Sequence, residues 1–171
     1  MDYAIIAAGE GSRLVQEGVK WPKPLVQLNG TALIDRLINV FLKNDASSIS
    51  IIVNEEMTEV QEHLRKLELP VPFYLLVIST PCSMHSFYEL SHHLDSDHIC
   101  LTTVDTIFKE EEFGGYIQAF LKESQLDGLM AVTDFIDDEK PLYVDTDNDL
   151  VIQGFLDKQG EPPCSYISGG I

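Results

Sequence analysis

Short apolar runs alternate with amphipathic segments along the chain, and this alternation constrains the fold more than any other feature of the sequence. The runs that predict buried strands cover residues 2–8, 49–53, 73–78, 98–104 and 128–133. The segments with apolar residues at three- and four-residue steps predict helices over residues 31–42, 54–67, 84–94 and 110–122. Strands that alternate with helices predict an α/β fold with a mostly parallel central sheet.

Two segments that follow strands, residues 9–13 and Asp105, are expected at one edge of this sheet. Gly9 follows the first strand and Asp105 follows the fourth, and ligands of open α/β sheets bind beyond the carboxyl ends of the strands. We therefore expect a single domain, residues 1–171, built as a Rossmann-like three-layer α/β/α sandwich with a mostly parallel, mixed central sheet. Local signals add a short strand over residues 25–28, a turn at Asn29-Gly30, and helix caps at Thr31 and Asn54.

The net charge of the chain limits the classes of partner that it is expected to bind. The formal net charge is −17, and a surface of that sign repels nucleic acid and anionic membranes, so we expect neither as a partner. No apolar run is long enough for a membrane span, and the first residues lack the basic segment of a signal peptide, which predicts a cytoplasmic protein. Cys82, Cys100 and Cys164 are widely spaced, which predicts reduced, buried thiols.

The loop after the first strand combines glycines with polar side chains. Gly9-Glu10-Gly11-Ser12-Arg13 can present backbone amides, a hydroxyl and a guanidinium to a phosphate group. Leu14 stands where a dinucleotide fingerprint needs a third glycine, and the Gly-Lys-Ser/Thr of a Walker loop is absent. The two glycines alone therefore do not distinguish a phosphate loop from a plain turn.

The continuation of this loop is a locally basic region in an acidic protein. Three basic residues (Arg13, Lys20 and Lys23) stand against two acidic ones over residues 9–23, a net charge of about +1. Lys23 lies between two prolines, which predict an extended backbone that leaves the ammonium group free to reach the crevice. At short range such a cluster can hold a phosphate ligand despite the global charge.

Taken together, these motifs resemble those of the nucleotidyltransferases that make nucleoside diphosphate sugars. A-A-G-E-G-S-R-L is followed about ten residues later by W-P-K-P-L and then by L-N-G-T-A-L-I-D. The family pattern is roughly A-A-G-x-G-[ST]-R-[LM], then P-K-[PA]-[LM], then G-x-P-[LM]-[IL] at a helix start. The match covers about the first forty residues closely, and the order of elements agrees to the carboxyl end.

The resemblance implies a role for each matched position. The backbone at Ala8, Gly9 and Gly11 would approach the nucleotide, and the side chains of Ser12 and Arg13 would hold the β- and γ-phosphates. Lys23 would bridge the α-phosphate and the incoming phosphate. Asp105 resembles the family's strand-end aspartate that binds Mg²⁺, although Val104 stands where the family more often has glycine. Arg13, Lys23 and Asp105 would thus form the catalytic set.

Two segments depart from the family pattern. Where the family often has a small-residue run such as G-T-A against the base, this chain has T-P-C-S-M-H-S; Ser83 and Met84 are expected to line the base side, and the nucleobase stays open. At the carboxyl end, Y-I-S-G-G-I resembles a segment whose glycines touch the sugar, which assigns Gly169 and Gly170 to sugar binding. Family members continue for several dozen residues with a second metal-binding carboxylate and a closing helix. We therefore expect a chain that is short at its carboxyl end, with uncovered sheet surface that favours a homo-oligomer.

The implied reaction joins an NTP and a sugar 1-phosphate into an NDP-sugar and pyrophosphate, with Mg²⁺ as cofactor. Two alternatives stay open: a cytidylyltransferase of molybdopterin or phosphocholine type, and a non-catalytic nucleotide-binding domain. The run D-T-D-N-D at residues 145–149 is not an EF-hand loop, because Leu150 and Leu156 stand where glycine and glutamate are needed. We predict a solvated hairpin turn there and a surface run at residues 137–139.

Overall fold

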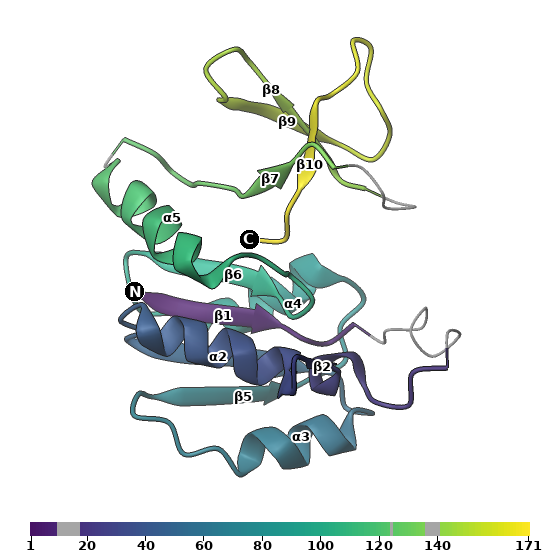
Figure 1. Cartoon of the computed structure of the whole chain (residues 1–171), viewed down its shortest axis with the longest axis vertical. Coiled ribbons are helices and arrows are strands. Elements are labelled where there is room, and N and C mark those ends of the chain that lie inside the picture. Colours follow the sequence, from purple (N-terminus) through teal and green to yellow (C-terminus); the bar gives the residue numbers. More distant parts are fainter. Residues whose placement is uncertain (10–17, 124, 136–140) are drawn as a thin grey trace. The chain divides into compact units, whose positions relative to one another are not determined.

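Four strands form a parallel sheet, as the apolar runs predict. In this computed structural model, the sheet has the order β5–β4–β1–β6, with β1 (Asp2–Ile6), β4 (Ser48–Val53), β5 (Phe73–Val77) and β6 (Ile99–Thr103) (Figure 1). Asp2 of β1 lies opposite Ser48 on one side and Ile99 on the other. The chain runs from β1 outward to β5 and then returns to the other side of β1. This reversal places a topological switch point between β1 and β6.

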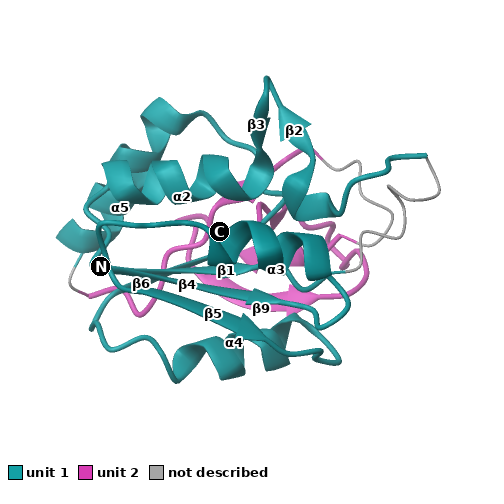
Figure 2. Cartoon of the chain, turned by 90° about the horizontal axis from the view of Figure 1, so that it is seen from below, with its two compact units in different colours: residues 1–123 teal, residues 124–171 magenta. Residues whose placement is uncertain are grey.

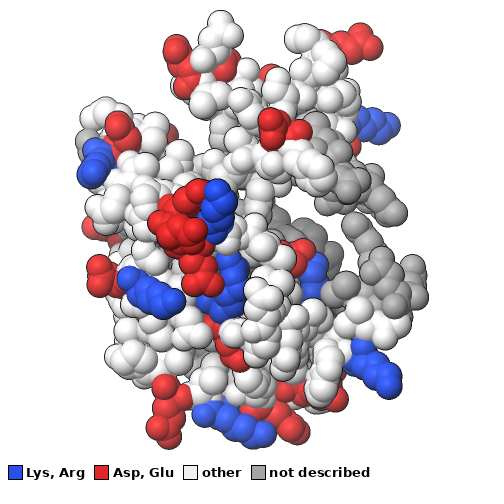
Figure 3. Space-filling view, in the orientation of Figure 1, with Lys and Arg blue, Asp and Glu red and all other residues white. Residues whose placement is uncertain are grey.

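The structure describes residues 1–9, 18–123, 125–135 and 141–171. The chain divides into two compact units, Met1–Glu123 and Ser124–Ile171, which Figure 2 draws in two colours. Among the described residues, no helix has the length and apolar character needed to cross a membrane. On the face drawn in Figure 3, the Lys and Arg side chains of the described residues are scattered among Asp and Glu side chains.

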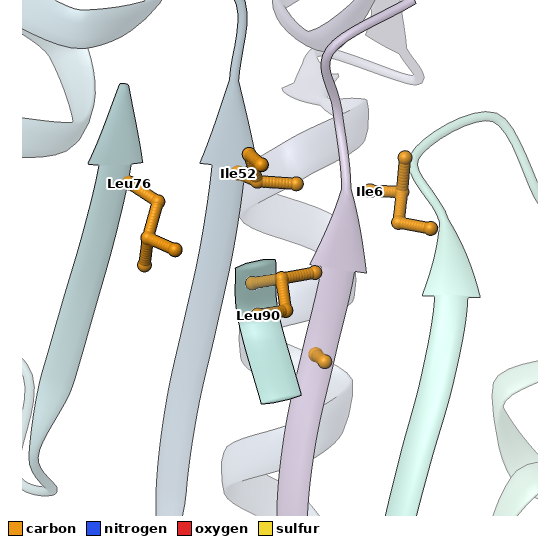
Figure 4. Close-up of a cluster of buried hydrophobic side chains, with 5 residues drawn as sticks. Ile6, Ile52, Leu76 and Leu90 are labelled. Carbon is orange, nitrogen blue, oxygen red and sulfur yellow. The ribbon is translucent and has the colours of Figure 1, made fainter. Parts of the chain in front are cut away.

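Helices cover both faces of the parallel sheet, because successive side chains of a strand point to opposite faces. On one face, Tyr3 stacks on Phe41 of α2 (Leu33–Lys43) with a centroid distance of 4.4 Å, and Phe113 of α5 (Glu110–Lys122) lies 5.9 Å from Phe41. On the other face, Ile6 packs with Leu90 of α4 (Ser83–Ser91), in a cluster that also contains Ala4, Ile52 and Leu76 (Figure 4). The three-layer α/β/α fold class is confirmed.

A small hairpin precedes α2 and replaces the helix cap expected at Thr31. β2 (Gln27–Leu28) pairs with β3 (Thr31–Ala32) through Asn29 and Gly30, whose φ angles are 52° and 83°. Positive φ at both central residues is typical of a two-residue hairpin turn, so the Asn29-Gly30 turn is confirmed. The Thr31 cap is wrong: the Leu33 amide donates to the Val26 carbonyl (2.9 Å), and α2 begins without a side-chain cap.

The start of α3 (Thr58–Arg65) also differs from the prediction. Asn54 does not cap this helix, because its Oδ1 accepts from the Glu56 amide (2.8 Å) and its carbonyl from the Met57 amide (3.1 Å). These bonds close a turn that separates β4 from the helix. Asn54 therefore stabilises a turn by accepting backbone hydrogen bonds, and asparagine is favoured in such turns as well as at helix caps.

The second unit is an antiparallel sheet in the order β7–β10–β8–β9. Its strands are β7 (Val132–Thr133), β8 (Tyr143–Thr146), β9 (Ile152–Leu156) and β10 (Tyr166–Ser168). The strand expected over residues 128–133 is thus short, and it pairs with β10 rather than with the parallel sheet. An apolar run predicts a strand but does not predict which strand it pairs with. Because β7 joins the second sheet, the central sheet contains only parallel strands and is not mixed.

The turn between β8 and β9 confirms the hairpin predicted for residues 145–149. Asp147 Oδ1 accepts from the amides of Asp149 and Val151, both at 3.0 Å. Its carboxylate is therefore engaged by the turn backbone. Residues 137–139 lie outside the described residues.

Candidate functional site

The carboxyl ends of β1 and β6 meet at the switch point of the sheet. The Val104 amide donates to the Ile6 carbonyl (3.1 Å), which keeps the two chains paired up to the loops that leave them. Ala8 is half-buried and Gly9 is exposed, and a Cβ on Gly9 would meet no described atom within 4 Å. The described residues therefore leave open space at Gly9. Gly11, Ser12 and Arg13 lie outside the described residues, and their roles stay predictions.

Lys23 begins a short 3-10 helix, η1 (Lys23–Leu25), instead of the extended segment expected between its prolines. The Leu25 amide donates to the Pro22 carbonyl (2.8 Å) and the Val26 amide to the Lys23 carbonyl (3.2 Å). Pro22 itself is extended, with φ −53° and ψ 142°. The 3-10 turn forms directly after it, and Pro24 is tolerated inside this turn because proline has no backbone N–H that would need a partner. Pro24 is buried and anchors the turn.

The structure brings together two predicted site residues that are far apart in sequence. Lys23 Nζ donates to Asp105 Oδ2 at 2.5 Å, with side-chain exposures of 28% and 46%. Burial alone would raise the pKa of the Asp105 carboxyl, but the hydrogen bond and charge of Lys23 outweigh it, and the hydroxyl of Thr103 adds to their effect. The pKa of Asp105 is therefore below its usual value, and the carboxylate is charged at neutral pH.

The loop that follows Asp105 is contacted by a residue that sequence reasoning missed. Arg36 of α2 is buried, and it donates to the carbonyls of Thr106 and Phe108. A signal for it exists in the sequence, since Arg36 stands three residues after Leu33 and four before Val40, and both are buried on α2. A charged residue inside an apolar helical stripe indicates a specific polar partner.

Ser83 and Met84 lie in the first turn of α4, and both are exposed. This helix follows β5, which is three strand spacings, about 14 Å, from β6 in the sheet. Next to them, Cys82 Sγ lies 3.1 Å from His85 Nδ1. The hydrogen bond with His85 lowers the pKa of the Cys82 thiol to about 7. Cys82 is exposed, so the expectation that all three thiols are buried is wrong at this position.

Gly169 and Gly170 lie at the end of β10 in the second unit, where the backbone itself needs glycine. The Gly169 amide donates to the Ala131 carbonyl (2.8 Å), and a Cβ on Gly169 would lie 3.0 Å from that oxygen. Gly170 has a φ of 85°, a conformation that favours glycine. Their sugar-binding role stays a prediction.

The chemistry of Asp105 fits a magnesium ion that is held mainly by substrate. Mg²⁺ prefers oxygen ligands and is commonly bound through one or two carboxylates together with phosphates and water. Asp105 presents one charged, half-exposed carboxylate at the strand end. In the part of the chain that the structure describes, no cluster of three or more His, Cys, Asp or Glu side chains could hold a metal alone.

A cavity of about 510 Å³ lies elsewhere in the first unit. It is lined by residues of η1, the β2–β3 hairpin, α2 and α3, among them Trp21 and the Asp35–His63 pair (2.7 Å). None of its lining residues is one of those predicted for the nucleotide. The switch point, not this cavity, brings Lys23 and Asp105 together.

This chain matches one family model and is similar to two curated proteins. A family model described as "MobA-like NTP transferase domain" matches residues 3–161. The bifunctional protein GlmU of Thermodesulfovibrio yellowstonii is 28% identical over 123 residues, 71% of this chain and 26% of its own. The 2-aminoethylphosphonate cytidylyltransferase of Lancefieldella rimae is 28% identical over 111 residues, 63% of this chain and 44% of its own. The chain thus spans less than half the length of these curated relatives.

Solved structures share the fold over nearly the whole chain. The inositol-1-phosphate CTP transferase from T. maritima has a TM-score of 0.73 and 18% identity, and covers 99% of this chain and 68% of its own. A Bacillus anthracis protein assigned as a glucose-1-phosphate thymidylyltransferase has a TM-score of 0.78 and 21% identity, and covers 99% of this chain and 69% of its own. At these identities the likeness concerns the fold alone.

Proposed function

The chain belongs to the family of MobA-like NTP transferase domains, and from this premise we propose that it joins an NTP to a sugar 1-phosphate, giving an NDP-sugar and pyrophosphate. The observation that carries the proposal is the Lys23–Asp105 pair at the switch point between β1 and β6. One cation and one carboxylate, which the sequence separates by 82 residues, meet where ligands of open α/β sheets bind. The motifs of the first forty residues or so, which resemble the sugar nucleotidyltransferases, support the sugar 1-phosphate as acceptor.

In the proposed reaction, a phosphate oxygen of the acceptor attacks the α-phosphorus of the NTP in line. The new phosphorus–oxygen bond forms as the bond to the β-phosphate oxygen breaks, and pyrophosphate leaves with that electron pair. The protein contributes position and charge rather than a covalent intermediate. Lys23 would leave Asp105 for the phosphates and stabilise the charge that gathers there. One cation about 4 Å from a phosphate oxygen contributes roughly 4 kcal/mol at an effective dielectric near 20.

Asp105 is the residue that would hold Mg²⁺. When bound, the ion neutralises the triphosphate and so favours departure of pyrophosphate. The contribution of the chain is a carboxylate that is already ionised before the nucleotide binds, because Lys23 lowers the pKa of Asp105 as long as the two side chains are paired. Arg13, although outside the described residues, is proposed to bind the β- and γ-phosphates.

The decisive experiment measures pyrophosphate release with each of the four NTPs and a panel of phosphate acceptors, with and without Mg²⁺. We expect turnover with at least one sugar 1-phosphate, and its loss in Asp105→Asn. Lys66→Met, an exposed change at the residue that follows α3 and outside the proposed site, serves as control. In calorimetry, Arg13→Ala should weaken NTP binding by at least about 1.5–3 kcal/mol, the range for a charged hydrogen bond. Full activity in Asp105→Asn would contradict the proposal.

A second candidate is cytidylyl transfer to another phosphate or phosphonate acceptor. It is favoured by the match to the 2-aminoethylphosphonate cytidylyltransferase and by the different residues of the stretch T-P-C-S-M-H-S. The same panel separates the two, since this candidate predicts turnover with CTP and no sugar 1-phosphate. Nucleotide binding without any turnover would instead support a non-catalytic nucleotide-binding domain.

A further inference from the structure

A buried arginine holds the backbone of the loop that carries Asp105. The side chain of Arg36 on α2 is 9% exposed. Its Nη1 donates to the Thr106 carbonyl (3.3 Å) and its Nη2 to the Phe108 carbonyl (2.6 Å). Both carbonyls lie within three residues of Asp105. The guanidinium therefore fixes the path of the chain where it leaves β6.

The same guanidinium is held on two further sides. Its Nε lies 3.3 Å from Glu110 Oε1 at the start of α5, and its central carbon lies 4.6 Å from the centroid of the Phe108 ring. The Phe108 ring in turn stacks on Phe113 with a centroid distance of 5.0 Å. A planar guanidinium suits this arrangement, because it donates in fixed directions while its face lies on a ring. A lysine ammonium at this position could not make the same set of contacts.

The helix that carries Arg36 also holds the segment that carries Lys23. The Leu33 amide, first in α2, donates to the Val26 carbonyl (2.9 Å) just after η1, and η1 packs against α2. α2 thus holds Lys23 through its amino-terminal end and Asp105 through Arg36. Both members of the ion pair are positioned by one rigid element.

We propose that Arg36 is a positioning residue for Asp105, and that it sets where the Asp105 carboxylate meets the Lys23 ammonium group at the switch point. This rests on the proposed function, in which both side chains act on the nucleotide, while Arg36 acts through the backbone of the Asp105 loop. Burying a guanidinium carries a desolvation cost that an apolar residue in the same helical stripe would avoid. The four contacts of Arg36 offset that cost, and all of them lie on the loop or the helix that follow Asp105.

The test uses Arg36→Met and Arg36→Lys, with Lys43→Met as the matched control. Lys43 is the other cation beside Glu110 (3.6 Å), but its side chain is 69% exposed and it contacts no carbonyl of the loop in the described structure. The first readout is amide hydrogen exchange, which does not depend on any activity. We expect exchange over residues 104–109 to accelerate about tenfold or more in both Arg36 variants, with β4 unchanged. Lys43→Met should leave both segments unchanged.

The second readout separates positioning from general stability. If the wild type turns over, kcat should fall about a hundredfold in Arg36→Met, the effect of a misplacement near 1 Å, while KM for the NTP stays within about threefold. Arg36→Lys should not restore kcat, because a single ammonium nitrogen cannot reproduce the separate Nη1, Nη2 and Nε donors that contact the two carbonyls and Glu110. Arg36→Lys keeps the charge and decides the question if Arg36→Met does not fold.

Two outcomes would overturn the proposal. One is unchanged exchange over residues 104–109 together with unchanged kcat in a folded Arg36 variant. The other is acceleration that is equal in β4, which would show a global loss of stability. A wild type that releases no pyrophosphate with any substrate refutes the proposed function, and the exchange comparison still decides whether Arg36 holds the loop.

Discussion

Replacing Lys23 by methionine separates the contribution of the Lys23–Asp105 pair to folding from its proposed contribution to chemistry. Two unit charges 2.5 Å apart attract by about 7 kcal/mol at an effective dielectric near 20. Side-chain exposures of 28% and 46% mean that solvent screening and desolvation offset most of this, and exposed pairs typically contribute about 0.2–1 kcal/mol. We therefore expect Lys23→Met to lower the free energy of unfolding by no more than about 1 kcal/mol, or roughly 2–4 °C in Tm.

The same substitution should affect turnover much more strongly. A cation about 4 Å from a phosphate oxygen contributes roughly 4 kcal/mol, so kcat/KM should fall by about three decades. Thermal unfolding followed by circular dichroism gives the first quantity, and pyrophosphate release gives the second. Lys66→Met makes the same charge change just after α3 and should alter neither by a measurable amount. A Lys23→Met protein that is more than about 2 kcal/mol less stable but fully active would refute this reasoning.

Three further predictions follow from contacts in the first unit. Since the hydrogen bond with His85 lowers the pKa of Cys82 to about 7, its alkylation by iodoacetamide should rise with pH through a midpoint near 7. His85→Ala should move this midpoint upward, and bound NTP should slow the reaction if the base lies against residues 83–86. Gly115→Ala on α5 should stabilise the protein by about 0.5–1 kcal/mol in denaturant unfolding, because its Cβ meets open space. Gly114→Ala should gain less, because its Cβ would lie 3.0 Å from a carboxamide oxygen. Burial alone would raise the pKa of Asp105, but the contacts with Lys23 lower it overall in the folded protein. The ion pair therefore stabilises the fold at pH values above the unfolded pKa of about 3.9. This stabilisation is lost as the pH falls through the pKa of Asp105 in the folded protein. The stability difference between wild type and Asp105→Asn should therefore be level from about pH 5 to 7 and shrink in acid; a difference that grows in acid contradicts it.

A helix or strand is predicted correctly from the sequence where the hydrophobic pattern of its own residues determines its position. The helix expected over residues 110–122 has those bounds in α5, and three strands of the parallel sheet (β1, β5 and β6) lie within their apolar runs, while β4 begins one residue before its run. The same logic places Asp105 at the carboxyl edge, since strand ends in parallel sheets share an edge. It does not place β7, because two residues of strand take their position from β10, not from their own hydrophobicity.

Local signals failed where a backbone group of another segment supplied the missing partner. Thr31 has the side chain of a helix cap, yet the Val26 carbonyl already engages the first amide of α2, and Thr31 forms a strand. The proline that follows Lys23 disfavours helical conformation there, yet two amides close a 3-10 turn on carbonyls three residues earlier. In both cases the chain satisfies its polar backbone by bonds that side-chain patterns do not show.

The proposed site depends on sequence and fold in different ways. Its chemistry depends on the types of two side chains, an ammonium and a carboxylate, which the motifs around Lys23 and Asp105 identify. Its geometry depends on carbonyls at residues 106 and 108, which lie 70 and 72 positions from Arg36 and carry no mark in the sequence. Substituting Lys23 or Asp105 therefore tests which charges the reaction needs. Substituting Arg36 leaves the charges of Lys23 and Asp105 in the protein. It therefore tests whether these two charges must be held at fixed positions relative to each other.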